Sequence, residues 1–179
     1  MAFDGAAWEE AMVRLRPLLR LLAGRGLNPR FWRKTDPSDL VQITVAEAHR
    51  NRADFHGTTE RELVAWLRMI LGHRILDEVR KLQCQKNNME REVELNDSVR
   101  IVKTWTSPIS ALVRHEEALR VAAALEKLPG DQRRVIELVH YHNLNPNEAA
   151  QLMGRTPGSV TGLLRRAQET LQKLLPHSR

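Results

Sequence analysis

Cysteine is almost absent from this sequence of 179 residues, which contains only Cys84. A single cysteine excludes an internal disulfide and a cysteine-rich zinc site, so the fold must depend on packing alone. No apolar run approaches the ~18 residues that a membrane-spanning helix needs. The first ten residues, MAFDGAAWEE, are too acidic and polar for a secretory signal. We therefore expect a cytoplasmic protein with no membrane insertion.

The sequence also lacks the patterns of common catalytic and metal sites. It has no glycine-rich phosphate loop, no internal repeat and no low-complexity tract. His140 and His142 lie two residues apart, on different sides of a helix, and no nearby Cys or carboxylate completes a metal site. His115 is followed by two glutamates but lacks the second histidine of a zinc-protease helix. We expect a protein that is not an enzyme and has no metal or cofactor.

The charge balance is basic, with 28 Lys and Arg against 22 Asp and Glu, a net charge of +6. Residues 1–87 carry 15 basic and 11 acidic side chains, and residues 113–179 carry 10 and 7. Residues 88–112 between them carry 3 basic and 4 acidic side chains. A net charge of this sign permits nucleic acid as a partner, although it says nothing about the fold.

No segment shows sustained two-residue alternation, and every strongly periodic segment has the three- and four-residue spacing of a helix. The sequence therefore predicts an all-α fold. Pro17 interrupts the first periodic segment and predicts either a kink or a boundary there. The expected helices cover residues 8–22, 37–48, 60–83, 108–128, 131–139, 146–153 and 157–174.

Several of these helices have recognisable start signals. Asp36 precedes Pro37, so it can cap the second helix while the proline takes the first helical position. Thr58 or Thr59 can cap the helix that begins near residue 60. Asn145-Pro146-Asn147-Glu148 has the spacing of a capping box, in which the cap and the third helical residue bond each other's backbone.

Residues 85–107 show no helical period, and their asparagines, alternating charges and Ser107-Pro108 favour irregular chain. This stretch is longer than the usual connection inside a compact domain. We therefore predict two small domains, residues 1–86 and 108–179, joined by a linker over residues 87–107.

Residues 145–168 predict a helix-turn-helix. A short helix over 146–153 is followed by Gly154 and a second helix from Thr156, and the small residues Ala149 and Ala150 allow the two helices to cross closely. A helix of this kind can lie in the DNA major groove, with early residues near base edges and arginines near phosphates or guanine. A helical hairpin with solvated arginines is the alternative interpretation. The side chains expected on its outer side are Ser159, Thr161, Arg165 and Arg166, beside Gly162.

A second segment, residues 52–81, places Phe55 among basic side chains. An aromatic ring beside cations suits single-stranded nucleic acid, in which a base stacks on the ring. A lone loop phenylalanine that packs on the core, next to a solvated charged helix, is the alternative. Trp8 and Trp66 are expected in the core, and Trp32 and Trp105 at a domain contact.

These motifs resemble a known family. Region two of a bacterial RNA polymerase sigma factor is similar to residues 36–42 (DPSDLVQ), the loop with Phe55 and Gly57, Ala65-Trp66-Leu67 and Ile70. Region four is similar to Leu128-Pro129, 133–136 (RRVI), 147–150 (NEAA), 152–154 (LMG), 158–160 (GSV) and 164–167 (LRRA). Their order, the linker and the short length resemble the extracytoplasmic-function group (ECF, group IV), which keeps only these two regions. The resemblance covers about residues 8–84 and 108–175.

The resemblance implies three groups of site residues. Contacts with the polymerase clamp would fall on Asp39, Leu40, Gln42 and Glu47. Capture of a base flipped from the minus-ten element would fall on Arg52, Phe55, His56 and Gly57, with His73 and Arg74 lining the same element. Recognition of the minus-thirty-five duplex would fall on Arg155, Ser159, Thr161, Arg165 and Arg166. The linker would thread toward the active-site cleft and the RNA exit path of the polymerase.

The implied function is promoter recognition and DNA strand opening for transcription initiation. The implied partners are core RNA polymerase, through its beta-prime clamp and beta flap, and promoter DNA, both duplex and melted; an anti-sigma factor is a further candidate. Two departures alter the expected contacts. Ile43 replaces an acidic residue and makes the clamp contact more apolar, and Thr161-Gly162-Leu163 replaces basic residues and shifts base reading toward Arg165 and Arg166.

An alternative from another class is a dimeric helix-turn-helix repressor that binds duplex operators with symmetric half-sites. Such a repressor has no need of the helix that contains Asp39 and Gln42. A monomer that co-purifies with polymerase would favour the sigma factor.

Overall fold

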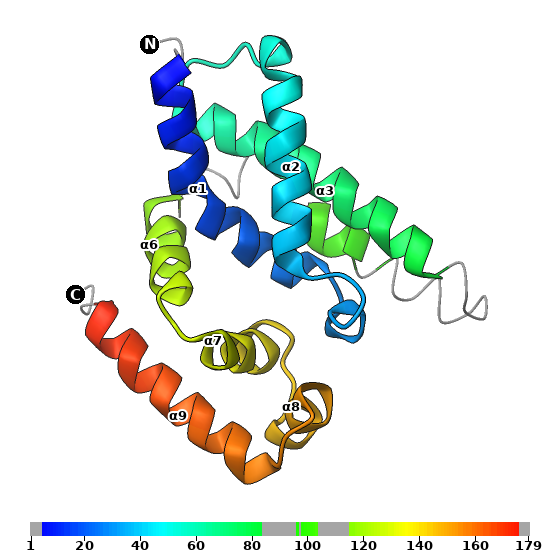
Figure 1. Cartoon of the computed structure of the whole chain (residues 1–179), viewed down its shortest axis with the longest axis vertical. Helices are drawn as coiled ribbons and strands as arrows, with labels where there is room; N and C mark the ends of the chain where they lie inside the picture. Colours follow the sequence, from blue (N-terminus) through cyan, green and yellow to red (C-terminus); the bar gives the residue numbers. More distant parts are fainter. Residues whose placement is uncertain (1–4, 84–95, 97, 104–114, 176–179) are drawn as a thin grey trace. The chain divides into compact units, whose positions relative to one another are not determined.

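The computed structural model describes residues 5–83, 96, 98–103 and 115–175. Every regular element within these residues is helical, which confirms the predicted all-α fold (Figure 1). The chain divides into two compact units, Met1–Glu116 (unit 1) and Glu117–Arg179 (unit 2). The predicted domain boundaries at residues 86 and 108 lie outside the described residues and stay a prediction.

Unit 1 is built on three helices, α1 (Gly5–Gly26), α2 (Pro37–Arg50) and α3 (Glu60–Gln83). Each helix packs on the other two, so their apolar stripes close a single core (Figure 1). The largest fully buried side chains of this core are Trp8, Leu15, Leu18, Leu19, Leu27, Leu40, Leu63, Leu67, Leu71 and Ile75. The apolar stripes predicted from the sequence are therefore the faces that pack.

The predicted helix starts of unit 1 form as expected. Oδ1 of Asp36 accepts a hydrogen bond from the backbone N–H of Ser38 at 2.7 Å, and Pro37 takes the first helical position. Oγ1 of Thr59 accepts from the N–H of Glu62 at 3.3 Å, and the Glu62 carboxylate accepts from the N–H of Thr59 at 2.8 Å. Thr59, of the two candidate threonines, thus forms a reciprocal capping box.

Helix α1 is longer than predicted and runs through Pro17 to Gly26. Pro17 is therefore not a helix boundary, and of the two effects predicted for this proline only a kink is left. A proline inside a helix removes one hydrogen bond and costs about 3 kcal/mol. Leu15 and Leu18 on either side are only 0% and 1% exposed. Burial of both flanks in the core therefore outweighs the local cost.

Residues 98–103 are helical, whereas the sequence predicts irregular chain for residues 85–107. This short helix packs against α3 at Gly72, where an added Cβ would lie 2.7 Å from Cγ1 of Val102. Val102 is 8% exposed and Ser98 is 3% exposed. We attribute the helical conformation of this segment to its burial against α3. The periodicity of residues 98–103 alone gives no information about this contact.

Gly72→Ala is expected to destabilise the protein by about 1 kcal/mol. Alanine gains ~1 kcal/mol of helix propensity over glycine, but overpacking costs about 1–3 kcal/mol because the β-branched Val102 has little rotamer freedom. Val102→Ala removes the clash, so Gly72→Ala is expected to be stabilising in that background. Urea unfolding of the four chains measures this change of sign, and a stabilising Gly72→Ala with Val102 present would contradict the packing.

Unit 2 contains most of helix α6 and all the helices that follow it. Its elements are α6 (His115–Glu126), α7 (Gly130–Ile136), the π-helical segment η3 (Glu137–Tyr141), α8 (Pro146–Met153) and α9 (Pro157–Leu174). Helix α9 packs on both α7 and α8 (Figure 1). The side chains of unit 2 with no exposed surface are Val135 on α7, Leu138 on η3, Ala149 on α8, and Val160 and Ala167 on α9. The predicted start of the first helix at Pro108 lies outside the described residues.

The predicted helix-turn-helix is confirmed by α8 and α9. Oδ1 of Asn145 accepts from the N–H groups of Asn147 at 3.0 Å and Glu148 at 3.1 Å, and the Glu148 carboxylate accepts from the N–H of Asn145 at 2.8 Å. Gly154 ends α8 in the left-handed region, with a φ of 63°. A side chain at Gly154 would be strained in this conformation. Local sequence signals therefore fix both ends of α8.

Candidate DNA and polymerase interfaces

The outer face of α2 carries some of the residues that the resemblance assigns to the polymerase clamp. Asp39 and Gln42 are exposed, and Ile43 beside them is 47% exposed, one of the few large apolar side chains on the surface of the described residues. Leu40 is only 1% exposed and packs in the core of unit 1. Its side chain therefore holds α2 in place and does not reach the outer face.

Glu47, the fourth clamp candidate, is bonded to Arg74, a candidate for the minus-ten element. Nε of Arg74 donates to Oε2 of Glu47 at 2.5 Å, and Nη2 donates to Oε1 at 2.9 Å. These bonds lower the pKa of Glu47 below its usual value and raise the pKa of Arg74. Because the folded-state pKa of Glu47 is depressed, the pair stabilises the fold at neutral pH, and its contribution is lost as the pH falls through that pKa.

The loop after α2 packs on an aromatic cluster formed by Trp8, Phe55 and Trp66. The ring centroid of Phe55 lies 5.4 Å from that of Trp66 and 6.0 Å from that of Trp8. The guanidinium carbon of Arg52 lies 5.1 Å from the centroid of Trp8, within cation–π range. An added Cβ at Gly57 would lie 2.5 Å from the Phe55 ring. Phe55 is half-buried, so one part of its ring packs on this cluster and another part is accessible; its role in nucleic-acid binding stays a prediction.

Two other candidates near this loop are solvent-exposed, and one further histidine contacts the aromatic cluster. His56 in the loop and His73 on α3 are exposed. Nε1 of Trp8 donates to Nδ1 of His49 at 3.1 Å, a contact that sequence reasoning missed. Trp8 is fully buried and Trp66 only partly, and Trp32 is buried with its Nε1 donating to the carbonyl of Leu27 at 3.1 Å. Trp105 lies outside the described residues, as does Cys84.

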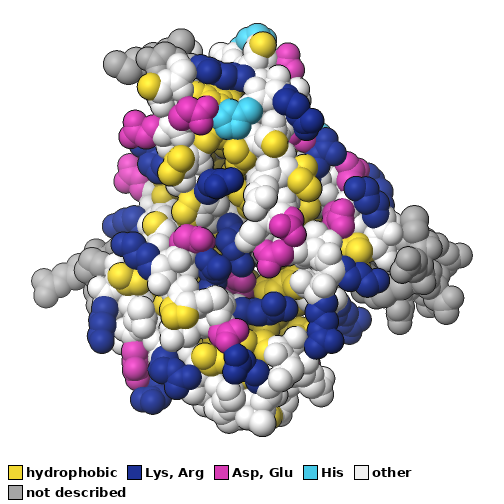
Figure 2. All heavy atoms as spheres, viewed as in Figure 1, with side chains coloured by type: hydrophobic (Ala, Val, Ile, Leu, Met, Phe, Trp, Pro, Cys, Tyr) yellow, Lys and Arg dark blue, Asp and Glu magenta, His cyan; other side chains and the backbone are white. Residues whose placement is uncertain are grey.

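Helix α9 presents its candidate residues on the side opposite its buried stripe, and Figure 2 shows Lys and Arg side chains along it. Arg165 is 72% exposed and pairs with Glu169 at 3.1 Å, one turn later. Arg166 is exposed, and Arg155 is exposed but pairs with Asp131 of α7. Exposed pairs of this kind contribute under about 1 kcal/mol, so a phosphate or a base can displace the carboxylate.

The other two α9 candidates lie at the start of the helix. Oγ1 of Thr156 caps the helix by accepting from the N–H of Ser159 at 3.3 Å, and Ser159 is half-buried. Thr161 is exposed, and its Oγ1 donates to the carbonyl of Pro157 at 3.0 Å. Gly162 is half-buried. Among the described residues, a Cβ added at this position would contact only the guanidinium of Arg166, with Nη1 3.5 Å away. The surface near Gly162 therefore leaves room for a close approach of another molecule.

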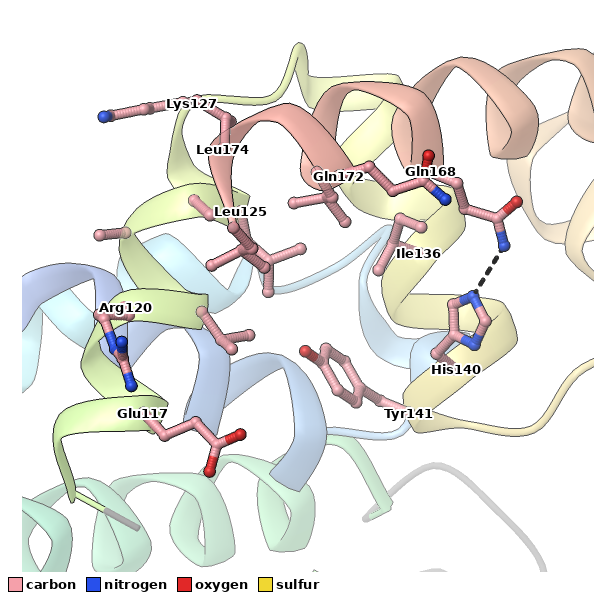
Figure 3. Close-up of a pocket in the computed structure, with 15 residues that line it drawn as sticks. Glu117, Arg120, Leu125, Lys127, Ile136, His140, Tyr141, Gln168, Gln172 and Leu174 are labelled. Carbon is pink, nitrogen blue, oxygen red and sulfur yellow. Dashed lines mark hydrogen bonds between the residues drawn. The ribbon is translucent and has the colours of Figure 1, made fainter. Parts of the chain in front are cut away.

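Unit 2 also has a groove of about 960 Å³ between α6, η3 and the end of α9 (Figure 3). Its apolar lining includes Val121, Leu125, Ile136, Leu171, Leu174 and Leu175. Tyr141 extends into this α6–α9 groove, and Nε2 of His140 lies 3.5 Å from Nε2 of Gln168 at its side (Figure 3). Both His140 and Tyr141 belong to the π-helical segment, which extends two residues beyond the helix predicted over residues 131–139. Glu117, Arg120 and Lys127 also line the groove, so it suits a partner surface that has both apolar and charged groups.

The sequence does not predict the α6–α9 groove, because Leu171 and Leu174 continue the apolar stripe of α9 at helical spacing, the pattern of core residues. Both are only half-buried. Among the described residues, no group of three or more His, Cys, Asp or Glu side chains could hold a metal ion. None of the described helices is long and apolar enough to cross a membrane.

Two family models match the chain. The model of Sigma-70 region 2 matches residues 12–84, which lie in unit 1, and the model of Sigma-70, region 4 matches residues 118–171, which lie in unit 2. Each compact unit therefore carries one of the two matched regions.

Individual relatives agree with these models. The chain is 32% identical over 137 residues to the ECF RNA polymerase sigma factor EcfG of Rhodopseudomonas palustris, which covers 76% of this chain and 70% of that protein. It is 28% identical over 139 residues to the RNA polymerase sigma factor HrpL of Pseudomonas syringae, covering 77% and 72%. A co-crystal structure of the sigma factor RpoE in complex with the anti-sigma factor NepR from Bartonella quintana is 25% identical, with a TM-score of 0.39 over 96% of this chain and 98% of that one. A score of this size adds nothing to the family assignment.

Sigma factors are the subunits that give RNA polymerase its promoter recognition, and they have no catalytic activity of their own. Both regions that define them are present here, in the order expected from the sequence motifs. The identity to EcfG extends across most of both proteins. The chain belongs to the extracytoplasmic-function (ECF) family of RNA polymerase sigma factors.

Proposed function

We propose that this chain binds core RNA polymerase in the cytoplasm, directs it to promoters with two separate elements, and stabilises the opened strand. Unit 1 engages the minus-ten element and unit 2 the minus-thirty-five element. The observation that carries this proposal is the presence of a region 2 and a region 4 in one chain, each in its own compact unit.

Unit 2 contacts duplex DNA through α9. Arg165 and Arg166 lie on the exposed side of α9. Arg165 pairs with the exposed carboxylate of Glu169, and Arg166 forms no ion pair among the described residues. An arginine fork can read guanine in the major groove through two parallel hydrogen bonds. Arg155, Ser159 and Thr161 lie nearer the start of α9, the part of a recognition helix that approaches the bases.

Unit 1 contacts the melted strand through the loop after α2 and the outer side of α3. The accessible part of Phe55 is suited to stack on a flipped base, and the aromatic cluster beneath it fixes the orientation of its ring. Arg52, His56 and His73 supply positive or hydrogen-bonding groups for the sugar–phosphate backbone, and Gly57 lets the loop approach the ring.

Phe55→Ala is expected to weaken strand opening on a cognate promoter by about tenfold, because base–aromatic stacking contributes ~1–3 kcal/mol. Binding to core polymerase is expected to stay unchanged. Permanganate reactivity of the melted thymines measures opening. Phe55→Tyr, which keeps the ring, is the matched control and should open normally. Unchanged opening by Phe55→Ala would show that the loop does not capture the base.

Two surfaces are suited to core polymerase. The outer face of α2 offers Ile43 as an apolar centre between the polar side chains of Asp39 and Gln42, the arrangement of an interface hot spot with a polar rim. In unit 2 the α6–α9 groove combines apolar side chains with the charged residues Glu117, Arg120 and Lys127, a mixture that suits a protein surface better than the uniformly anionic surface of DNA. We therefore assign α2 to the beta-prime clamp and the α6–α9 groove to the beta flap.

The proposed function is tested by transcription from fragments of the source genome, using core polymerase with and without this chain. Initiation at defined start sites is expected only when the chain is present. Absence of promoter-dependent initiation on every fragment would reject the proposal. A stable dimer that binds palindromic duplexes and ignores polymerase would instead support the repressor, which leaves the region 2 match without a role.

A further inference from the structure

One ion pair joins the two surfaces that the proposed function assigns to different partners. Glu47 lies on α2, beside the proposed polymerase contact, and Arg74 lies on α3, beside the proposed minus-ten contact. On the basis of that function, we propose that Glu47 occupies the phosphate-binding edge of Arg74 in the free chain, so that Arg74 reaches DNA only after a basic group of the polymerase has engaged Glu47.

The pair uses the edge of the guanidinium that also binds phosphate. Nε and Nη2 of Arg74 each donate to a different oxygen of Glu47, at 2.5 and 2.9 Å. Carboxylate and phosphate both accept two parallel hydrogen bonds from this edge. A DNA phosphate can therefore bind Arg74 in this way only when the Glu47 carboxylate has left.

The surroundings of Arg74 reinforce this masking. Its Nη1 lies 3.6 Å from Oδ2 of Asp77, so the guanidinium faces carboxylates on both α2 and α3. The side chain of Glu47 is 18% exposed and that of Arg74 is 38% exposed. A partly buried pair is screened by salt less than an exposed one. A guanidinium held between two carboxylates attracts a DNA strand weakly.

Glu47 is also within reach of a partner that covers α2. It follows Ile43 by four residues, and side chains four apart on a helix are neighbours on the same face. Ile43 is 47% exposed, at the centre of the proposed clamp contact. A polymerase lysine or arginine near Ile43 would compete with Arg74 for the carboxylate, which couples polymerase binding to DNA binding.

The test measures how binding of the free, full-length chain to a single-stranded oligonucleotide depends on salt. Each phosphate contact to a single strand adds about 0.7 to the slope of log K against log salt. Glu47→Gln is expected to steepen the slope by about this amount and to tighten binding at low salt by roughly threefold or more. Adding Arg74→Gln to Glu47→Gln is expected to restore the wild-type slope, since the unmasked cation is removed.

Glu78→Gln is the matched control, because it makes the same chemical and charge change on α3. The Glu78 carboxylate accepts from Oγ1 of Thr35 and lies 3.6 Å from Nζ of Lys81, and among the described residues it makes no ion pair with Arg74, four residues before it on α3. This variant is expected to keep the wild-type slope. An equal steepening in both variants would mean that net charge alone is responsible, and it would overturn the proposal.

An unchanged slope in Glu47→Gln also overturns the proposal, because it would make the pair only a structural link between α2 and α3. If circular dichroism shows that Glu47→Gln does not fold, Glu47→Asp, which withdraws the carboxylate by one methylene, is expected to change the slope in the same direction and decides the question. Transcription by the wild-type chain separates the two failures. Normal initiation with an unchanged slope rejects the masking alone, and absent initiation rejects the proposed function.

Discussion

Arg165→Ala is expected to lower the affinity for a cognate upstream duplex by about 1–3 kcal/mol, or roughly 5- to 150-fold, if Arg165 makes a two-bond contact with a base. The substitution also breaks the ion pair between Arg165 and Glu169. This loss is expected to cost little folding stability, because both side chains are exposed. Binding to scrambled duplexes is expected to change little. Fluorescence anisotropy with the two duplexes measures the difference.

Glu169→Gln is the control for this prediction, because it releases Arg165 without removing it. Normal or slightly tighter binding is expected from Glu169→Gln. A loss in Arg165→Ala that is equal on all sequences would identify a phosphate contact instead, and base reading would then pass to Arg166. The same series with Arg166→Ala tests that alternative.

Leu174→Asp is expected to reduce the affinity of the chain for core polymerase at least tenfold, since it places a negative charge among the apolar side chains of the α6–α9 groove (Figure 3). Leu174 is the last residue of α9 and is only half-buried, so the fold should be retained. Duplex DNA binding by α9 is expected to persist. Pull-down of purified core polymerase, with binding curves, measures the loss.

Leu174→Met is the matched variant because it keeps an apolar side chain of similar volume. It is expected to bind polymerase normally. If Leu174→Asp binds polymerase as well as the wild-type chain while its DNA binding is intact, the α6–α9 groove is not a polymerase contact. The apolar lining would then need another partner.

The sequence predicts best those features that depend on neighbouring residues. The caps at Asp36, Thr59 and Asn145, and the left-handed turn at Gly154, all form as expected because each is completed within four residues. The buried stripe of α3 also follows from its periodicity, and so does that of α9 as far as Ala167.

Features that depend on distant partners were not predictable in this way. The helix at residues 98–103 forms against Gly72 of α3, and Pro17 is tolerated because both of its flanks are buried. The spacing of apolar residues within one segment does not show which distant residues will pack against it. The π-helical segment η3 likewise carries no sequence signal that we can identify.

The same limit applies to the candidate sites. Leu40 belongs to the clamp motif of the resembled family, but its burial depends on how α2 packs. Glu47 and Arg74 were assigned to different partners, and only the packing of α2 on α3 brings them together. The α6–α9 groove needs four elements of unit 2 at once, α6, α7, η3 and α9.

The most direct measurement of the central claim is the mapping of transcript 5′ ends made by core polymerase reconstituted with this chain on its own genome. Two units, one for each promoter element, predict two blocks of shared sequence upstream of the start sites, at a fixed spacing near positions minus ten and minus thirty-five. Start sites that share no upstream sequence, or that share only one symmetric element, would contradict the account.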